Sequence, residues 1–309
     1  MSASVRPLRT GIVPLTPFTS LDGWRTRVRA IDEQGHDVLL MADHVGMVAP
    51  LPPLVAAAAM SERLRFGVQV LNNEFWNPVL LAREAATVDI LTAGRLELGF
   101  GAGHAAVEFA AAGIAYDRPR LRIDRLAAAV PVVRTLIEGG TVDVDATYGL
   151  EAASLGFAAV QPRIPVMIGG NGDRVLRLAA QQADIVGLTG FTSGTGQTHT
   201  DLSHFTWDGL ADRIDHVRRH AGERFAALEL SVLVQAVRRT DDRRAAAVEF
   251  AQGMIEDLEA LLDSPFLLFG TTDERTDQVA RLRDEMGVTY VTTFEPGAEA
   301  LAAAVAPLR

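Results

Sequence analysis

Short apolar runs alternate with longer amphipathic stretches along the whole chain. The runs are only six to ten residues long and rich in Val, Ile and Leu, a pattern typical of buried β-strands. We expect eight such strands, at residues 10–15, 37–42, 63–71, 95–100, 164–169, 183–188, 228–237 and 288–293.

The stretches between these runs have helical spacing. In one of them Trp24, Val28 and Ile31 share a face. In another, Asn77 can cap a helix that has Pro78 at its first position, and a glycine ends the pattern. Further helices are expected at residues 119–138, 173–183, 207–222 and 273–286.

Strands that alternate with helices predict an α/β fold with a parallel sheet, and eight strands is the number that closes a (β/α)8 TIM barrel. A doubly wound Rossmann-like sheet has the same alternation and stays an alternative. No linker interrupts the chain, so we expect one domain over residues 1–309. Insertions are expected after strands 4 and 6, at residues 141–163 and 191–205. Such insertions often build the active site, and the Gly/Thr/Ser-rich second one suits either a lid or a plain surface loop.

Composition excludes several classes of function. The formal net charge is −10, which argues against binding to nucleic acid or to a membrane surface. There is no cysteine, and all 29 basic side chains are arginine, so thiolate chemistry, a P-loop and a Schiff base are excluded. No secretory signal or membrane-spanning run is visible, and a cytoplasmic location is the default expectation.

Asp43 and His44 follow the second expected strand directly. In a closed barrel, the carboxyl ends of the strands carry the catalytic side chains. The two residues are therefore candidates for acid–base chemistry. The alternative is structural: Asp43 caps the next helix while His44 packs under a loop.

Two glycine-rich turns are candidates for binding a ligand. The run LGFGAGH, residues 98–104, follows the fourth strand and does not match the dinucleotide fingerprint. The run GGNG, residues 169–172, ends the fifth strand and opens into a helix, where free N–H groups can hold a phosphate. A simple tight turn is the alternative for the second run.

Two other patterns predict no site. His216 and His220 are one helical turn apart, but no third ligand accompanies them, so we interpret them as part of a solvated basic face rather than a metal site. No G-x-S-x-G elbow is present.

Taken together, five blocks in order resemble the luciferase-like monooxygenase superfamily, in its short bacterial branch that depends on coenzyme F420 or FMN. They are GHDVLLMADHV, NPVLLAREAATVDILTAGRLELGFGAG, GIAYDRPRLRIDRLAAAVPVVRTL, IPVMIGGNGDRVLRLAAQQADIVGL and LFGTTDERTDQVARLRDEMGVTYV. The resemblance implies a TIM barrel with coenzyme F420, or alternatively FMN, at the carboxyl-terminal mouth.

The resemblance also implies where the functional residues lie. It places a non-proline cis peptide near Gln69-Val70, and Asp43, His44 and His104 near the reacting ring. The other residues that it assigns to the cofactor are Gly101, Gly103, Gly169, Gly170, Asn171, Gly172 and Thr189. It further implies a homodimer and a small-molecule substrate. His104 stands where sugar-phosphate dehydrogenases of the family have Glu, Val48 stands where they have Trp, and their phosphate-binding lysines are absent, so an uncharged or mildly polar substrate is expected.

The resemblance leaves three functions open. The first is hydride transfer between coenzyme F420 and an imine, alkene, carbonyl or alcohol carbon, with His44 exchanging the proton and Asp43 orienting His44 or bonding the ring edge. His104 is a second acid–base candidate. The second is monooxygenation with reduced FMN. The third is a non-catalytic flavin-binding paralogue.

Overall fold

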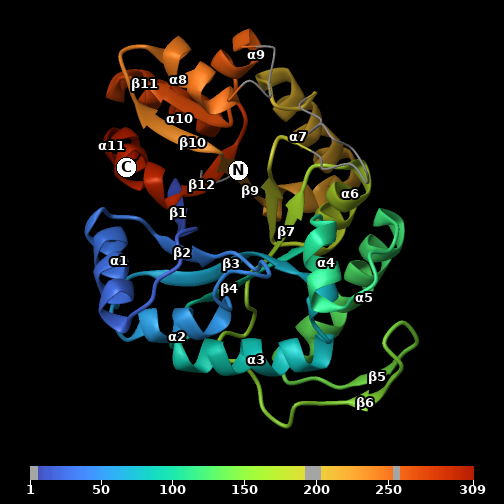
Figure 1. The fold of residues 1–309 in the computed structure, drawn as a ribbon. Coiled ribbons are helices and arrows are strands. Elements are labelled where there is room, and N and C mark those ends of the chain that lie inside the picture. Colours follow the sequence, from blue (N-terminus) through green and yellow to red (C-terminus); the bar gives the residue numbers. More distant parts are fainter. Residues whose placement is uncertain (1–5, 192–202, 253–257) are drawn as a thin grey trace.

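A computed structural model describes residues 6–191, 203–252 and 258–309. Eight parallel strands close into a barrel in the order β1-β12-β9-β8-β7-β4-β3-β2 (Figure 1). Each of the eight overlaps a segment expected from the sequence, with at least one end that differs by one or more residues, and the doubly wound alternative is wrong. The barrel strands are β1 (Arg9–Val13), β2 (Val38–Met41), β3 (Arg65–Asn72), β4 (Leu96–Gly101), β7 (Val166–Gly170), β8 (Ile185–Leu188), β9 (Glu229–Val234) and β12 (Val288–Phe294).

Helices cover the outside of the barrel (Figure 1). They are α1 (Leu21–Glu33), α2 (Leu51–Ala58), α3 (Pro78–Leu91), α4 (Ala106–Ala112), α5 (Pro119–Ile137), α6 (Asp173–Gln182), α7 (Trp207–Ala221), α8 (Arg243–Ala251), α9 (Leu258–Leu262), α10 (Thr272–Asp284) and α11 (Ala298–Val305). The Asn77 side chain caps α3 by accepting from the N–H groups of Val79 and Leu80, as expected. Within the described part of the chain, no helix has both the length and the apolar character needed to cross a bilayer.

Buried side chains form two layers. The larger cluster lies between the strands and the helices, and includes Trp24 at 1% exposure. A smaller cluster, which includes Val38, Leu40 and Tyr290, comes from the alternate positions of the strands that face the barrel interior. The interior is therefore packed with side chains below the mouth, as in other TIM barrels.

An ion network lies inside the barrel near the amino-terminal ends of the strands. Arg9 Nη1 donates to Glu97 Oε1 at 2.6 Å, and its Nη2 and Nε donate to the two carboxylate oxygens of Glu229 at 2.5 and 2.8 Å. The Arg9 guanidinium carbon lies 3.8 Å from the centre of the Tyr290 ring, and Arg65 Nε also donates to Glu97, at 2.7 Å. These side chains close the end of the barrel opposite the mouth.

The first expected insertion does not lie at the mouth. Residues 142–153 form a hairpin of β5 (Val142–Asp145) and β6 (Leu150–Ala153). The hairpin follows α5 and leads into β7, so it is a helix-to-strand connection, and Figure 1 shows it projecting from the barrel below α5. The expectation that residues 141–163 help to build the active site is therefore wrong, since none of them lines the cavity at the mouth. Most of the second expected insertion, residues 192–202, lies outside the described residues.

A further extension was not expected from the sequence. The seventh strand ends at Val234, because the Gln235 N–H donates to the carbonyl of Phe266 rather than continuing the barrel pairing. The chain then forms β10 (Ala236–Arg239), α8, α9 and β11 (Leu267–Gly270) before α10. Strands β10 and β11 pair with each other in parallel, outside the barrel. The sequence does not indicate this break, because β9 and β10 both lie within the one apolar run at residues 228–237.

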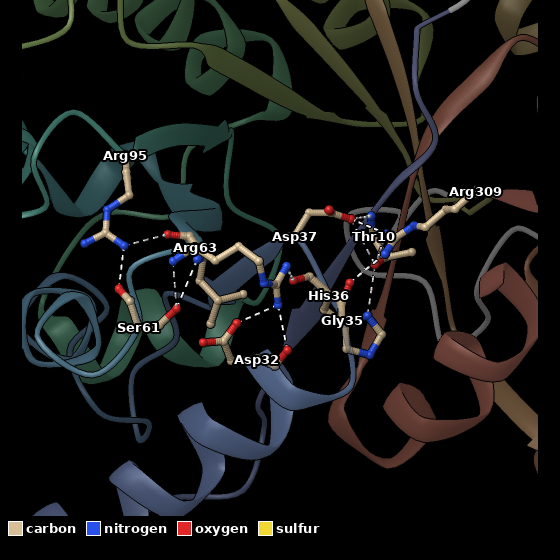
Figure 2. Close-up of polar contacts among 10 residues, drawn as sticks. Thr10, Asp32, Gly35, His36, Asp37, Ser61, Arg63, Arg95 and Arg309 are labelled. Carbon is tan, nitrogen blue, oxygen red and sulfur yellow. Dashed lines mark hydrogen bonds and ion pairs between the residues drawn. The ribbon is translucent and has the colours of Figure 1, made fainter.

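His36 joins the first strand to the last helix at the amino-terminal end of the barrel. Its ring is 1% exposed, and Figure 2 shows it beside Thr10, whose hydroxyl lies 2.9 Å from Nδ1. Nε2 donates to the carbonyl of Ala298 at 3.1 Å, so Nδ1 accepts from the Thr10 hydroxyl. The charged neighbours are Arg309, Asp37 and Arg63, and burial is the main reason why the pKa of His36 is lowered from 6.5 to about 4.

Acidification from pH 6.5 to pH 4 is expected to destabilise the protein through His36. In this range the unfolded chain binds a proton at His36 that the folded protein does not. The contribution of His36 to the free energy of unfolding is therefore fully present above pH 6.5 and is lost as the pH falls towards 4. The contribution lost is about 3 kcal/mol. Urea unfolding at intervals of half a pH unit measures the slope, which the His36→Gln variant should reduce. An equal slope in the variant would assign the acid sensitivity to other groups.

Candidate active site

A cavity of about 830 Å³ opens at the carboxyl-terminal ends of the barrel strands. Every residue that sequence analysis nominated lines it, although the residues come from five different strand ends. These are Asp43, His44, Gln69, Val70, Gly101, Gly103, His104, Gly169, Gly170, Asn171, Gly172 and Thr189. The structure thus brings the candidates together at one site, while their individual roles stay predictions.

His44 pairs with a residue that sequence analysis did not nominate. Its Nδ1 lies 2.8 Å from Glu108 Oε1, and this carboxylate comes from α4. The His104 ring stands edge-on to His44, with the ring centres 5.7 Å apart. Burial lowers the pKa of His104, and the charges of His44 and Arg122 lower it further. His104 is therefore expected to be neutral at physiological pH.

Asp43 is held by hydrogen bonds from the end of β3 and from Trp76. Its Oδ2 accepts from the indole Nε1 of Trp76 at 2.8 Å and from the backbone N–H of Asn72 at 3.1 Å. Burial is the main reason why the pKa of Asp43 is raised, and the two hydrogen bonds oppose that shift. Among the described residues it makes no hydrogen bond to His44, so Asp43 does not orient that ring directly and instead ties β2 to the end of β3.

The peptide bond between Gln69 and Val70 is cis, as the resemblance implied. Val70 lies at a shift in the pairing of β3 with β4, and its side chain lines the cavity. A Cβ on Gly101 would lie 2.6 Å from Val70 Cγ2, so only glycine leaves room for this side chain. A Cβ on Gly103 would lie 2.4 Å from Asn72 Oδ1, and its φ of +72° also favours glycine. These glycines therefore make space for β3.

The turn between β7 and α6 presents polar groups to the cavity. Gly172 caps α6 without any side-chain hydrogen bond, so the first N–H groups of the helix are not satisfied by a capping side chain. Asn171 is 3% exposed; its Nδ2 donates to His204 Nδ1 at 3.3 Å, but Oδ1 has no hydrogen-bond partner among the described residues. Gln69 Oε1 is likewise buried and lacks a partner among them. A polar ligand would satisfy both oxygens.

Arg122 holds the loop between β4 and α5. It is 4% exposed and donates to the carbonyls of Ala102, Asp117 and Gly103 and to the Tyr116 hydroxyl. Its donors are thus used by the loop rather than offered to a ligand. Sequence analysis missed this residue, and also missed an apolar part of the wall that consists of Leu15, Ile123, Phe191, Leu233 and Phe294.

The interpretation of His216 and His220 as a solvated face is wrong for His216. That ring is 7% exposed, and its Nε2 donates to the carbonyl of Asp173 at 3.0 Å, which ties α7 to α6. The described part of the chain contains no group of His, Asp and Glu arranged to hold a metal ion.

Comparison with known proteins places this site in a family context. The chain is 33% identical to an F420-dependent glucose-6-phosphate dehydrogenase of Nocardia farcinica over 184 residues, which is 55% of this chain and 53% of that one. It is 31% identical to a 5,10-methylenetetrahydromethanopterin reductase of Archaeoglobus fulgidus over 158 residues, 51% of this chain and 46% of that one. These alignments span about half the length of the relatives.

Solved structures share the fold over almost the whole chain. An F420-dependent secondary alcohol dehydrogenase superposes with a TM-score of 0.78 at 17% identity, covering 98% of this chain and 100% of that one. The FMN-bound oxygenating constituent of 3,6-diketocamphane monooxygenase, from Pseudomonas putida, gives 0.72 at 17% identity, covering 98% and 99%. A model of the luciferase-like monooxygenase family matches residues 9–300. With the barrel and the match over nearly its full length, this chain belongs to the luciferase-like monooxygenase family.

Proposed function

We propose that this protein is an oxidoreductase that transfers a hydride between coenzyme F420 and a small organic substrate at the barrel mouth. The observation that carries the proposal is the cavity itself. In it, an imidazole paired with a carboxylate lies in one space with buried polar groups that have no hydrogen-bond partner among the described residues. The sequence relatives whose names state F420 dependence support this cofactor over FMN.

The residues present fit the cofactor. The buried oxygens of Gln69 and Asn171 are acceptors for its polar groups, and the glycine turn that opens α6 offers N–H groups to a phosphate. Val70 provides an apolar surface that can support a flat ring. When bound, the coenzyme supplies a two-electron hydride donor or acceptor.

His44 exchanges the proton in this proposal. Its Nδ1 is engaged with Glu108, and no described residue bonds Nε2, so Nε2 is available to a substrate oxygen or nitrogen. In the direction of alcohol oxidation, Nε2 would take the hydroxyl proton and the substrate carbon would give its hydride to the bound coenzyme; the reverse reaction would return both. His44 thus accounts for the proton and the coenzyme for the hydride, so the reaction balances.

The cavity favours an uncharged substrate. Its wall contains aliphatic and aromatic side chains, and Arg122 already donates to the loop carbonyls. Arg174, which also lines the cavity, has a side chain that is 54% exposed at the start of α6, where it suits the anionic tail of a cofactor. An alcohol, carbonyl or imine carbon in an apolar molecule fits this surface.

Titration of the protein with F420 and with FMN, followed by fluorescence quenching, tests the proposal. Binding of F420 without FMN supports hydride transfer, whereas binding of FMN alone supports a monooxygenase. Binding of neither supports the non-catalytic paralogue.

Replacing Asn171 by Ala is expected to weaken cofactor binding about 10-fold, the value of one hydrogen bond to a buried oxygen. The same titration measures it. Gln34→Ala is a matched control, because Gln34 Oε1 is also buried without a partner among the described residues but lies on the α1 terminus, away from the cavity. Equal affinities for Asn171→Ala and the control would remove Asn171 from the binding site.

A further inference from the structure

We propose that Glu108 is the positioning residue of the site: its carboxylate holds His44 in the tautomer protonated at Nδ1, and thereby leaves Nε2 as the atom that exchanges a proton. The tautomer is a property of the protein alone. Only the use of Nε2 in catalysis rests on the proposed function.

The contact between the two side chains defines the tautomer. A carboxylate accepts hydrogen bonds and cannot donate them, so the 2.8 Å contact of Glu108 Oε1 with His44 Nδ1 requires a hydrogen on Nδ1. The Glu108 side chain is 15% exposed and the His44 side chain 37%, so the contact lies at the edge of the cavity rather than in open solvent. Partial burial strengthens a charge-assisted hydrogen bond of this kind.

Helix α4 is anchored so that Glu108 cannot easily move away. The next residue, Phe109, is fully buried and packs against the rings of Phe75 and Tyr116, with centre-to-centre distances of 5.5 and 4.9 Å. The Arg122 guanidinium lies over the Tyr116 ring at 4.2 Å, and the Tyr116 hydroxyl donates to the carbonyl of His104. The carboxylate is therefore presented from a packed element although α4 is short.

Within the described residues, no other acidic group contacts the His44 ring. Asp43, the adjacent residue, is engaged through Oδ2 with Trp76 and Asn72. His104, which stands edge-on to His44, can share a proton but cannot provide a fixed negative charge. Glu108 comes from outside the Asp43–His44 pair, and among the described residues it supplies the carboxylate that contacts His44.

The carboxylate has a second effect during turnover. When Nε2 takes a proton from a substrate hydroxyl, the His44 ring becomes positively charged, and the negative charge of Glu108 stabilises that imidazolium. The proton returns from Nε2 in the reverse reaction while Nδ1 keeps its hydrogen. Removal of Glu108 should therefore reduce kcat and leave KM nearly unchanged.

Long-range ¹H–¹⁵N correlation spectra of the protein without cofactor test the tautomer, with the His44 signals assigned by their loss in His44→Gln. We expect the wild type to show a protonated Nδ1 and a bare Nε2, and Glu108→Ala to lose this preference. Glu108→Gln retains an acceptor oxygen and should keep the tautomer. Val107→Gln is the matched control on the same helix, because Val107 is 77% exposed and does not line the cavity.

Turnover provides the second measurement. Glu108→Ala should lower kcat about 10- to 100-fold, the range observed when a carboxylate behind a functional histidine is lost. Glu108→Gln should lower kcat less, and Val107→Gln should not change it. A wild-type tautomer in Glu108→Ala, or equal losses of kcat in Glu108→Ala and Val107→Gln, would overturn the proposal. If the wild type binds neither F420 nor FMN, the proposed function fails while the spectra still decide the role of Glu108.

Discussion

Replacing His44 by Ala is expected to lower kcat by about 10²- to 10⁴-fold, the contribution of a well-placed acid–base group. The variant should bind F420 with the affinity of the wild type, because the acceptors assigned to the cofactor lie elsewhere, on Gln69 of β3 and on Asn171 in the turn between β7 and α6. The effect is large because the His44 imidazole has a charged partner on Nδ1 and, among the described residues, no hydrogen-bond partner on Nε2. Stopped-flow absorbance of the coenzyme measures turnover, and quenching measures affinity.

Two further variants make the result for His44 specific. His220→Ala lies on α7 outside the cavity and should retain the wild-type kcat. His104→Ala tests the second acid–base candidate, and should lower kcat less, since burial and neighbouring charges lower its pKa and leave it a weak base. An unchanged kcat in His44→Ala would exclude His44 as the proton carrier, and a larger loss in His104→Ala would transfer the role to that residue.

The barrel could be predicted because its strands are buried on both faces. Such strands appear in the sequence as continuous apolar runs, and helical spacing separates most of them, so both signals agree along the chain. The break after Val234 could not be predicted in this way. Strands β9 and β10 are adjacent apolar segments, and the feature that separates them is a hydrogen bond from Gln235 to Phe266, which only the folded chain reveals.

The candidate residues could be located because the carboxyl ends of parallel strands meet at one mouth. Their partners could not, because the pairs join distant segments. Trp76 reaches Asp43 across 33 positions, and Glu108 reaches His44 across 64. Helix α4 itself gives little sequence signal, since it is seven residues long and has no capping side chain at its start.

Gly101, at the end of β4, also has a role within the protein. The resemblance assigns it to the cofactor, which stays a prediction, and the structure shows that a Cβ at this position would meet Val70. The side chain that lines the cavity here is therefore Val70 of β3, and the glycine at position 101 of β4 leaves the space that Val70 occupies. A larger residue at position 101 would displace Val70 before it touched a ligand.

Arg9→Met is expected to destabilise the folded protein by about 3–5 kcal/mol, the usual effect of removing one partner from a buried ion pair. Methionine preserves much of the apolar stem, but Glu229 then loses both of its hydrogen bonds to the guanidinium. The Arg9, Glu97 and Glu229 side chains are 19%, 5% and 12% exposed, so water replaces the lost partner poorly. Urea unfolding monitored by circular dichroism measures the change.

The double variant Arg9→Met/Glu229→Gln separates the charge from the packing. It leaves no uncompensated carboxylate at the base of the barrel, because Glu97 keeps its contact with Arg65, so part of the lost stability should return. A change below 1 kcal/mol in Arg9→Met would show that solvent reaches this end of the barrel. No return in the double variant would instead assign the loss to the contact between the guanidinium and the Tyr290 ring. The two results therefore distinguish whether the ion pair with Glu229 or the contact with the Tyr290 ring stabilises the end of the barrel opposite the mouth. This end holds together the strands that lead to His44 and Asn171.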